Sequence, residues 1–239
     1  MNPLSYIQDQ LKLLNIDANQ IQLEQLFRFY EMLVEKNKVM NLTGITEFEE
    51  VVEKHFIDSL IIHKFRNLDQ KLKVIDIGTG AGFPGIPLKI LFPKLELVLM
   101  DSLNKRLKFL DEVIMDLGLE HIKTLHGRAE DLGQKIEYRE QFDFCVSRAV
   151  ANLTTLSELC LPFVKVGGEF ISYKSKDVEE EIAQAGHAVK ILAGSKSNME
   201  LFSLPNTDIS RSFVFIKKEK STPKKYPRKA GLPGKEPLQ

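Results

Sequence analysis

The sequence predicts an α/β fold: a mainly parallel, Rossmann-like sheet with helices on both faces, a helical extension before it and a basic tail after it. Three observations predict this fold. From residue 72 onward, short apolar runs alternate with amphipathic helical stretches, as they do in parallel sheets. A turn with four glycines follows the first of these runs. The segment before residue 71 shows only helical periodicity.

The first 70 residues are expected to form the helical extension. Apolar side chains recur at helical spacing from Ile21 to Val34, and Asn19 is a suitable N-cap for that helix. The stretch NLTGI at 41–45 breaks it. Thr46 and Glu49 predict a capping box for a second helix. The apolar face of this second helix would carry Val52, Phe56, Ser59 and Leu60.

Residues 71–218 are expected to form one domain built on five parallel strands. The predicted strands are Lys73–Gly78, Leu95–Asp101, Ile122–Gly127, Phe142–Ala149 and Glu169–Lys174. Helices are predicted between them, notably at Asn104–Leu117 and Asn152–Val164. Two further apolar runs, Met199–Leu204 and Ser212–Lys217, are joined by Pro-Asn-Thr-Asp, which predicts an antiparallel hairpin.

The charge of the chain is balanced overall but uneven along its length. The formal net charge of the 239 residues is zero. Between Lys217 and Gln239, eight basic residues stand against two acidic ones, so this end carries +6 and the remainder −6. Residues 219–239 therefore form a basic, proline-containing tail. Such a tail fits a polyanion partner, and it equally fits a solvated, disordered segment.

We expect a monomeric protein that is located in the cytoplasm and does not associate with a membrane. No apolar run approaches the roughly 20 residues of a membrane span, and the N-terminus has no signal-peptide pattern. Cys145 and Cys160 lie in apolar segments and are expected to pack as small hydrophobic side chains. No metal is expected, because ligand spacing is missing among His55, His63, His121 and His126.

The glycine-rich stretch IDIGTGAGFPGIPL allows two registers. Gly80, Gly82 and Gly85 match the dinucleotide pattern G-x-G-x-x-G, but that register leaves Asp76 and Gly78 unexplained. The alternative register, D-x-G-x-G-x-G, begins at Asp76. A carboxylate there suits the ammonium or sulfonium end of S-adenosylmethionine and would repel a diphosphate. This second register, together with the hairpin at the end of the domain, favours a methyltransferase over a dehydrogenase.

Seven segments together resemble the RsmG (GidB) family of bacterial ribosomal RNA methyltransferases, and the resemblance spans nearly the whole chain. The segments are NLTGI (41–45), HFIDSL (55–60), IDIGTGAGFPGIPL (75–88), DSLNKRLKFL (101–110), GRAED (127–131), SRAV (147–150) and TPKKYPRK (222–229). The resemblance implies a class I methyltransferase sheet, S-adenosyl-L-methionine as the cofactor and no metal. It also implies methylation of guanine N7, at guanine 527, in 16S rRNA or in the small-subunit ribosomal particle.

Cofactor contacts are expected at the ends of the first two strands and in the turn after the third. Gly78, Gly80 and Phe83 belong to the glycine loop, and Asp101 can accept hydrogen bonds from a ribose diol. In the turn after the third strand, the resemblance implies that the Ala129 N–H and the Glu130 carboxylate contact the adenine. A solvated acidic turn is the alternative for these last two residues.

The catalytic residues are expected on the fourth and fifth strands. Arg148 ends the fourth strand, where a charge must be paired or used, and it is expected to position substrate and cofactor. A buried ion pair with Asp76 or Asp101 is the alternative. Lys174 ends the fifth strand and is expected to contact an RNA phosphate or the guanine O6, unless it is an ordinary strand-end lysine. Arg128 allows the same two interpretations.

Two further residues and three further functions stay open at this point. His55 and Asp58 can share one helix face, where a helix-packing hydrogen bond is favoured over a role toward RNA. Guanine N7 already has a free lone pair, so the lack of an evident general base agrees with methylation there. The alternatives are a small-molecule methyltransferase, a non-catalytic RNA-binding protein on the same fold and a dehydrogenase.

Overall fold

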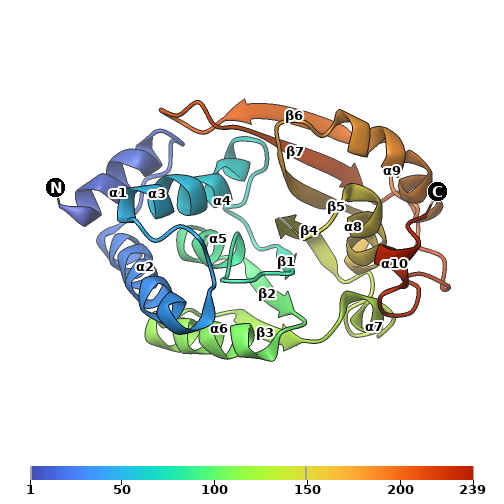
Figure 1. Ribbon diagram of the computed structural model, residues 1–239, viewed down its shortest axis with the longest axis horizontal. Helices are drawn as coiled ribbons and strands as arrows, with labels where there is room; N and C mark the ends of the chain where they lie inside the picture. Colours follow the sequence, from blue (N-terminus) through green and yellow to red (C-terminus); the bar gives the residue numbers. More distant parts are fainter. Residues whose placement is uncertain (1, 149, 239) are drawn as a thin grey trace.

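The computed structural model describes residues 2–148 and 150–238. Its centre is a seven-stranded sheet in the order β3-β2-β1-β4-β5-β7-β6 (Figure 1). The strands are β1 Lys73–Ile77, β2 Glu96–Asp101, β3 Ile122–His126, β4 Phe142–Arg148, β5 Val164–Ser175, β6 Asn198–Ser203 and β7 Ser210–Lys217. Strands β1 to β5 are parallel, and β7 runs antiparallel to both β5 and β6. The α/β class and the closing hairpin are therefore confirmed.

The strand bounds differ from the prediction mainly at β5. This strand begins at Val164, five residues before the predicted Glu169. The glycines at 167 and 168 look like a break in the sequence, but Val164 pairs with Phe142 of β4 across a register shift. The last residue predicted for β4 lies outside the described residues.

Two groups of helices cover the two faces of the sheet (Figure 1). The first group, with its short π-helical and 3-10 turns η1 and η2, comprises α1 Pro3–Lys12, α2 Gln20–Met40, α3 Phe48–Val51, η1 Val52–Ile57, α4 Asp58–Leu60, η2 Ile61–Lys64, α5 Gly85–Leu91 and α6 Asn104–Asp116. The second group comprises α7 Ala129–Leu132, α8 Leu153–Cys160, η3 Leu161–Phe163 and α9 Glu179–Ile191, with α10 Leu232–Lys235 packed on α8.

Alternation along the strands produces the two hydrophobic cores. Leu97 and Leu99 of β2 point into the core shared with the N-terminal helices, and Val98 between them points into the core shared with α7, α8 and α9. Successive side chains of a strand lie on opposite faces, so an unbroken apolar strand supplies both cores. Residues 2–70 thus share one hydrophobic core with the sheet.

The N-terminal helices begin and end where local capping chemistry requires, with one exception. Asn19 caps α2, and the side chain of Gln22 completes a capping box. Asn41 ends α2 with φ at 49°. The predicted cap at Thr46 is wrong: α3 follows Glu47, whose side chain makes no capping hydrogen bond. The Thr46 carbonyl instead accepts a hydrogen bond from the Tyr30 hydroxyl at 3.2 Å.

The helical segment after α3 contains a π-helical turn, η1, before it becomes α4. A π turn inserts one residue into the helix, widens it and often lies at a functional site. In this turn the Ser59 hydroxyl donates to the His55 carbonyl at 2.6 Å. The residues predicted for the apolar face are buried as expected: Val52, Phe56, Ser59 and Leu60.

The C-terminal segment is ordered and docked over residues 219–238, so the disordered alternative is wrong for the described part of the tail. Arg228 forms a two-pronged ion pair with Glu158 of α8, whose side chain is only 1% exposed. Lys218 is fully buried and donates to the Leu161 carbonyl at 2.6 Å. Burial lowers the pKa of Lys218 to about 8. Lys218 and Arg228 are therefore engaged within the protein and are not free for a polyanion.

Candidate functional site

The glycine loop after β1 turns through residues with positive φ. Gly78, Gly80 and Gly82 have φ values of 72°, 60° and 97°, a region that favours glycine. The N–H of Gly78 donates to the Met100 carbonyl of β2 at 2.8 Å. A Cβ atom at Gly78 would lie 2.5 Å from Cγ2 of Val150. The loop therefore lies close against β2 and the segment after β4, where only glycine fits.

Asp76 lies beneath this loop and is fully buried. Its Oδ2 accepts hydrogen bonds from the Thr79 hydroxyl at 2.7 Å and from the Gly85 N–H at 3.1 Å. Its Oδ1 has no partner among the described residues. Burial raises the pKa of Asp76 to about 7. The carboxyl group therefore organises the loop and the start of α5, a role that sequence analysis did not anticipate.

A cavity of about 400 Å³, which we call the loop cavity, opens at the glycine loop. Five of the predicted site residues line it: Gly78, Gly80, Phe83, Asp101 and Arg148. The structure thus brings together the ends of β1, β2 and β4, as expected for the carboxyl edge of a parallel sheet.

Asp101 holds one wall of the loop cavity. Its carboxylate accepts hydrogen bonds from the Gly80 N–H at 3.0 Å and from the Leu103 N–H at 2.8 Å. Arg106 of α6 pairs with it at 3.3 Å. Because three donors fix this carboxylate at the cavity wall, its remaining lone pairs are preorganised to accept hydrogen bonds from a diol.

Ala129 and Glu130 are not among the residues that line the loop cavity. Ala129 is buried at the start of α7, and Oε1 of Glu130 accepts a hydrogen bond from the Gly231 N–H at 2.8 Å. Arg128, at the N-cap of α7, is exposed and lines neither this cavity nor the one described below. The turn that the resemblance assigns to the adenine is thus tied to the C-terminal segment.

Arg148 is paired with the N-terminal helices, not with either predicted aspartate. Its Nη1 donates to Oδ2 of Asp58 at 3.0 Å, and its guanidinium carbon lies 5.0 Å from the centre of the Phe83 ring. Asp58 is also paired with Arg211 of β7, at 3.4 Å. Asp58 therefore makes a packing contact, as favoured, but to the sheet: its carboxylate bridges two guanidinium groups, one on β4 and one on β7.

His55 stands between Arg148 and the glycine loop. Its ring stacks on Phe83 with 4.7 Å between centroids, and its Nε2 lies 2.8 Å from the Thr43 hydroxyl. Its Nδ1 lies 3.5 Å from Nη2 of Arg148. Burial and the adjacent guanidinium lower the pKa of His55 to about 4. The imidazole is therefore neutral at physiological pH, and it lines the site instead of only packing helices together.

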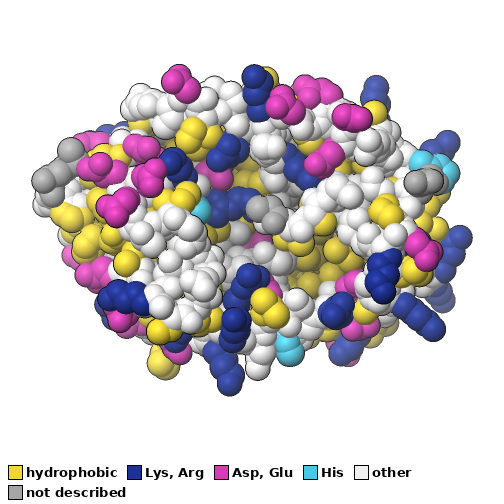
Figure 2. Space-filling model, viewed as in Figure 1, with side chains coloured by type: hydrophobic (Ala, Val, Ile, Leu, Met, Phe, Trp, Pro, Cys, Tyr) yellow, Lys and Arg dark blue, Asp and Glu magenta, His cyan; other side chains and the backbone are white. Residues whose placement is uncertain are grey.

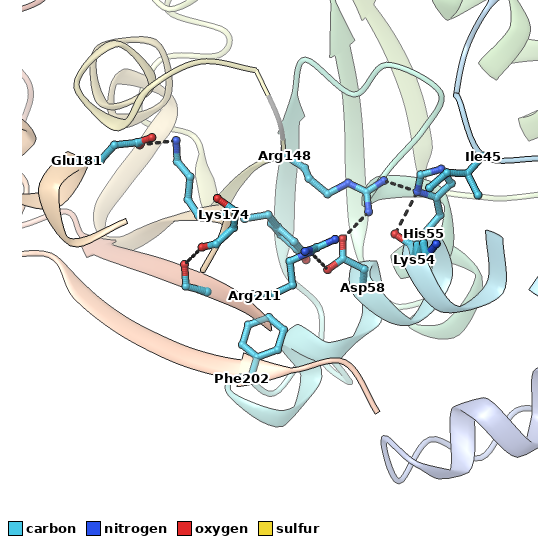
Figure 3. A pocket seen from close by; sticks show the side chains of 12 residues that line it. Ile45, Lys54, His55, Asp58, Arg148, Lys174, Glu181, Phe202 and Arg211 are labelled. Carbon is cyan, nitrogen blue, oxygen red and sulfur yellow. Dashed lines mark hydrogen bonds and ion pairs between the residues drawn. The ribbon is translucent and has the colours of Figure 1, made fainter. Parts of the chain in front are cut away.

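A second cavity of about 510 Å³ lies on the other side of Arg148 and His55, which line both. We call it the hairpin cavity, because Phe202, Arg211 and Ser212 of the β6–β7 hairpin form one wall (Figure 3). The face drawn in Figure 2 is hollowed near its centre, with Lys and Arg side chains around the hollow. The two cavities thus adjoin at Arg148 and His55.

Lys174 lines the hairpin cavity but is engaged within the protein. Its Nζ pairs with Glu181 of α9 at 2.6 Å (Figure 3). The same atom donates to the Ala151 carbonyl at 2.9 Å. Its side chain is 11% exposed. Both predicted catalytic residues therefore border this cavity, and each already has an ion-pair partner.

Sequence analysis missed Phe202 and Arg211. The two are direct partners in the antiparallel β6–β7 pair, so they lie side by side on the same face of the hairpin. The available signal was their placement, because the two residues stand on opposite sides of the predicted hairpin turn, each three residues from it.

The described residues lack the features of two other classes of site, a membrane span and a metal centre. None of the helices there combines the length and the hydropathy needed to cross a bilayer. No group of three or more His, Cys, Asp or Glu side chains in residues 2–148 and 150–238 is placed to hold a metal ion. Cys145 and Cys160 are both buried and unbridged.

The family model and the curated relatives that match this chain belong to the same protein family. The family model described as rRNA small subunit methyltransferase G matches residues 22–210. A protein of Lachnoclostridium phytofermentans named ribosomal RNA small subunit methyltransferase G is 53% identical over 228 residues, which cover 95% of this chain and 94% of that protein. The protein of that name from Desulforamulus reducens is 49% identical over the full length of both chains.

Solved structures with distant sequences share the fold. A predicted O-methyltransferase from Agrobacterium tumefaciens superposes with a TM-score of 0.53 at 16% identity, covering 70% of this chain and 81% of that one. A SAM-dependent methyltransferase from Aquifex aeolicus gives a TM-score of 0.51 at 20% identity, covering 70% of this chain and 92% of that one. At this identity the likeness extends to the fold alone.

Proposed function

This chain belongs to the rRNA small subunit methyltransferase G family, and we propose that it transfers a methyl group from S-adenosyl-L-methionine to N7 of a guanine in 16S rRNA. The nucleotide that the resemblance implies is guanine 527. The observation that carries the proposal is the meeting of two cavities at Arg148 and His55. A methyltransferase must hold a donor and an acceptor side by side, and this geometry provides two adjoining compartments for them.

The loop cavity fits the cofactor. Gly78 and Gly80 have no side chains, so the loop backbone is accessible to a ligand at the cavity wall. The Asp101 carboxylate is fixed where it can accept hydrogen bonds from the ribose hydroxyls. Ala129 and Glu130 would contact the adenine from the turn after β3. S-adenosyl-L-methionine supplies an electrophilic methyl group on a sulfonium. The protein's own task on this side is to bind and orient that group toward Arg148.

The residues at the junction supply positioning and no general base. Guanine N7 carries a lone pair, so no proton has to be removed before it attacks. With a pKa of about 4, the neutral imidazole of His55 is a weak base, and the Asp58 carboxylate is engaged by two guanidiniums, so neither side chain is placed to remove a proton. Arg148, fixed by Asp58 and the Phe83 ring, would orient donor and acceptor, and a well-oriented pair gains most of its rate from that placement. Lys174 would position the acceptor from β5.

The tail supports RNA as the partner. Its exposed cations lie on an ordered, docked segment and include Lys220, Lys224, Lys225, Lys229 and Lys235. Phosphate contacts from such residues add affinity that falls with salt. We take 16S rRNA or the small-subunit particle as the substrate and propose a monomer that acts in the cytoplasm.

The test is single-turnover methylation of small-subunit particles and of naked 16S rRNA between pH 6 and 9. The product nucleotide is identified by borohydride and aniline cleavage, which is specific for N7-methylguanine. The expected rate is flat, because no group at the junction titrates as a base in this range. Methyl on an exocyclic amine or a ribose, or a log-linear rise of the rate with pH, would overturn the proposal.

A further inference from the structure

The hairpin cavity has the charge of a site for an electron-rich group. Four cationic side chains line it, and only two carboxylates, Asp58 and Glu181, face them. His55 adds no charge, because its imidazole is neutral. The cavity therefore favours a ligand whose exposed edge carries hydrogen-bond acceptors, as the O6 and N7 edge of guanine does.

Three of these cations have every terminal nitrogen in contact with a partner in the protein. Nζ of Lys174 is bound by Glu181 and the Ala151 carbonyl. The two terminal nitrogens of Arg148 face Asp58 and His55, and Nζ of Lys54 pairs with Glu50. These contacts hold the three side chains against the protein.

Arg211 differs from the other three cations. Its Nε faces Oδ1 of Asp58 at 3.4 Å, and its Nη1 donates to the Ser210 carbonyl at 3.2 Å. Its Nη2 makes no hydrogen bond within residues 2–148 and 150–238, and 30% of its side chain is exposed. Asp58 therefore holds the guanidinium at the cavity wall with one nitrogen free (Figure 3).

Phe202 provides a fixed apolar surface next to that free nitrogen. It is the cross-strand partner of Arg211, and its ring stacks on Phe213 with 4.7 Å between centroids. Phe65 packs against the same ring at 5.7 Å. An aromatic side chain held in this way suits a nucleobase that has left its stack, because bases bind to such rings through their faces.

We propose that the hairpin cavity receives the target guanine, with Phe202 against the base and Nη2 of Arg211 donating to O6. The inference rests on the proposed function. A single free nitrogen fits this reaction, because a two-pronged arginine contact would occupy N7 as well as O6 and block its lone pair. Arg211 is thus a specificity-determining residue that reads the base and leaves the reacting atom free.

The experiment replaces the target guanine in reconstituted small-subunit particles by 2-aminopurine, which lacks O6, or by inosine, which keeps O6 and lacks the exocyclic amine. Single-turnover rates are compared for the wild type, Arg211→Gln, Arg211→Lys and Phe202→Leu. Lys217→Gln, an exposed cation at the other end of β7, is the matched control. Calorimetric binding of S-adenosyl-L-methionine shows whether each variant is folded.

A hydrogen bond from a charged donor gives discrimination of about 10- to 100-fold. The wild type and Lys217→Gln should prefer guanine over 2-aminopurine, and Arg211→Gln should lose that part of the preference while its preference over inosine stays unchanged. Intrinsic differences between the bases cancel, because each enzyme meets the same substrates. Arg211→Lys should keep an intermediate preference, and Phe202→Leu should slow all three bases alike.

Two results would overturn the inference. An unchanged preference over 2-aminopurine in Arg211→Gln would show that Arg211 does not read O6. An equal loss on all bases together with a weaker salt dependence would assign Arg211 to a phosphate. Failure of the proposed function is distinct, because the wild type would then form no N7-methylguanine on any substrate.

Discussion

Each of the two cavities rests on a buried aspartate, and the two aspartates are held in opposite ways. Asp76, beneath the loop cavity, has a hydroxyl and a backbone N–H as partners, three and nine residues away along the chain. Asp58, beside the hairpin cavity, has two guanidiniums, and the Arg148 partner is 90 residues away. One carboxyl group shapes a local turn, and the other joins β4 and β7 to an N-terminal helix.

This difference between the two cavities indicates which kind of ligand each one suits. The glycine loop between Gly78 and Phe83 supplies the largest continuous part of the wall of the loop cavity, so backbone conformation sets the shape of that wall. The hairpin cavity is built from four distant segments, so its shape depends on side-chain charge. Backbone shape suits a constant cofactor, and an arrangement of charged side chains suits recognition of one particular base.

The largest expected effect is on the loop cavity, where Gly78→Arg should weaken S-adenosyl-L-methionine binding by more than about 100-fold. A Cβ there already meets Val150, and φ is 72°, so the arginine would fill the cavity wall and add a cation beside a sulfonium. Isothermal titration measures the change. Gly80→Ala is the milder control, because its Cβ would meet nothing closer than 3.9 Å. Wild-type affinity in folded Gly78→Arg would refute the cofactor assignment.

The second-largest effect should come from a change at the hairpin cavity, which should slow methyl transfer and leave cofactor affinity nearly unchanged. Asp58→Asn leaves two guanidiniums without their shared carboxylate, and breaking a buried pair costs on the order of 3 kcal/mol. We expect the single-turnover rate to fall about 100-fold, with S-adenosyl-L-methionine affinity within about threefold of wild type. Titration and rapid quench on the same preparation give both numbers. Equal losses in the two would mean that the cavities are not separable.

The same contrast separates the features that the sequence predicted from those that it did not: the loop cavity was largely predictable, and the hairpin cavity was not. The glycine loop, Asp101 and nearly all strand bounds were predictable, because consecutive residues and period-two apolar runs determine them. The partner of Arg148 was not predictable, since nothing near it in sequence indicates Asp58. Phe202 and Arg211 become neighbours only through the β6–β7 register. The docking of the tail likewise depends on Glu158, a buried acid of α8 that lies 70 residues from its partner Arg228.

A smaller effect should show whether cofactor binding depends only on the glycine loop and its neighbours or also on the C-terminal segment. Arg228→Ala removes the ion pair that seats the C-terminal segment, and that segment binds Glu130 through the Gly231 N–H. If Glu130 contacts the adenine, cofactor affinity should fall about three- to tenfold; Lys229→Ala, an exposed neighbour, should have no effect. Calorimetry with S-adenosyl-L-methionine decides the matter. Unchanged affinity in Arg228→Ala would make the tail solely an RNA-facing element.

The last effect is on stability and not on binding or rate, and it concerns Asp76. The pKa of Asp76 is about 7 in the folded protein, against 3.8 as the ordinary value, because burial disfavours the charged form. Between these two pH values the folded protein holds a proton that the unfolded chain has released. The stability from this group is therefore complete below about pH 4 and is lost as the pH rises to about 7.

The loss should approach about 1 kcal/mol per pH unit, and urea unfolding at pH 5, 6 and 7 would measure it. Asp76→Asn cannot ionise, so its free energy of unfolding should rise relative to the wild type across this interval, whatever its absolute value. All other carboxyl groups titrate in both proteins and cancel in the difference. Parallel curves would mean that Asp76 is already ionised when folded. An unseen cationic partner would then have to lie at its free Oδ1, and the contrast with Asp58 would disappear.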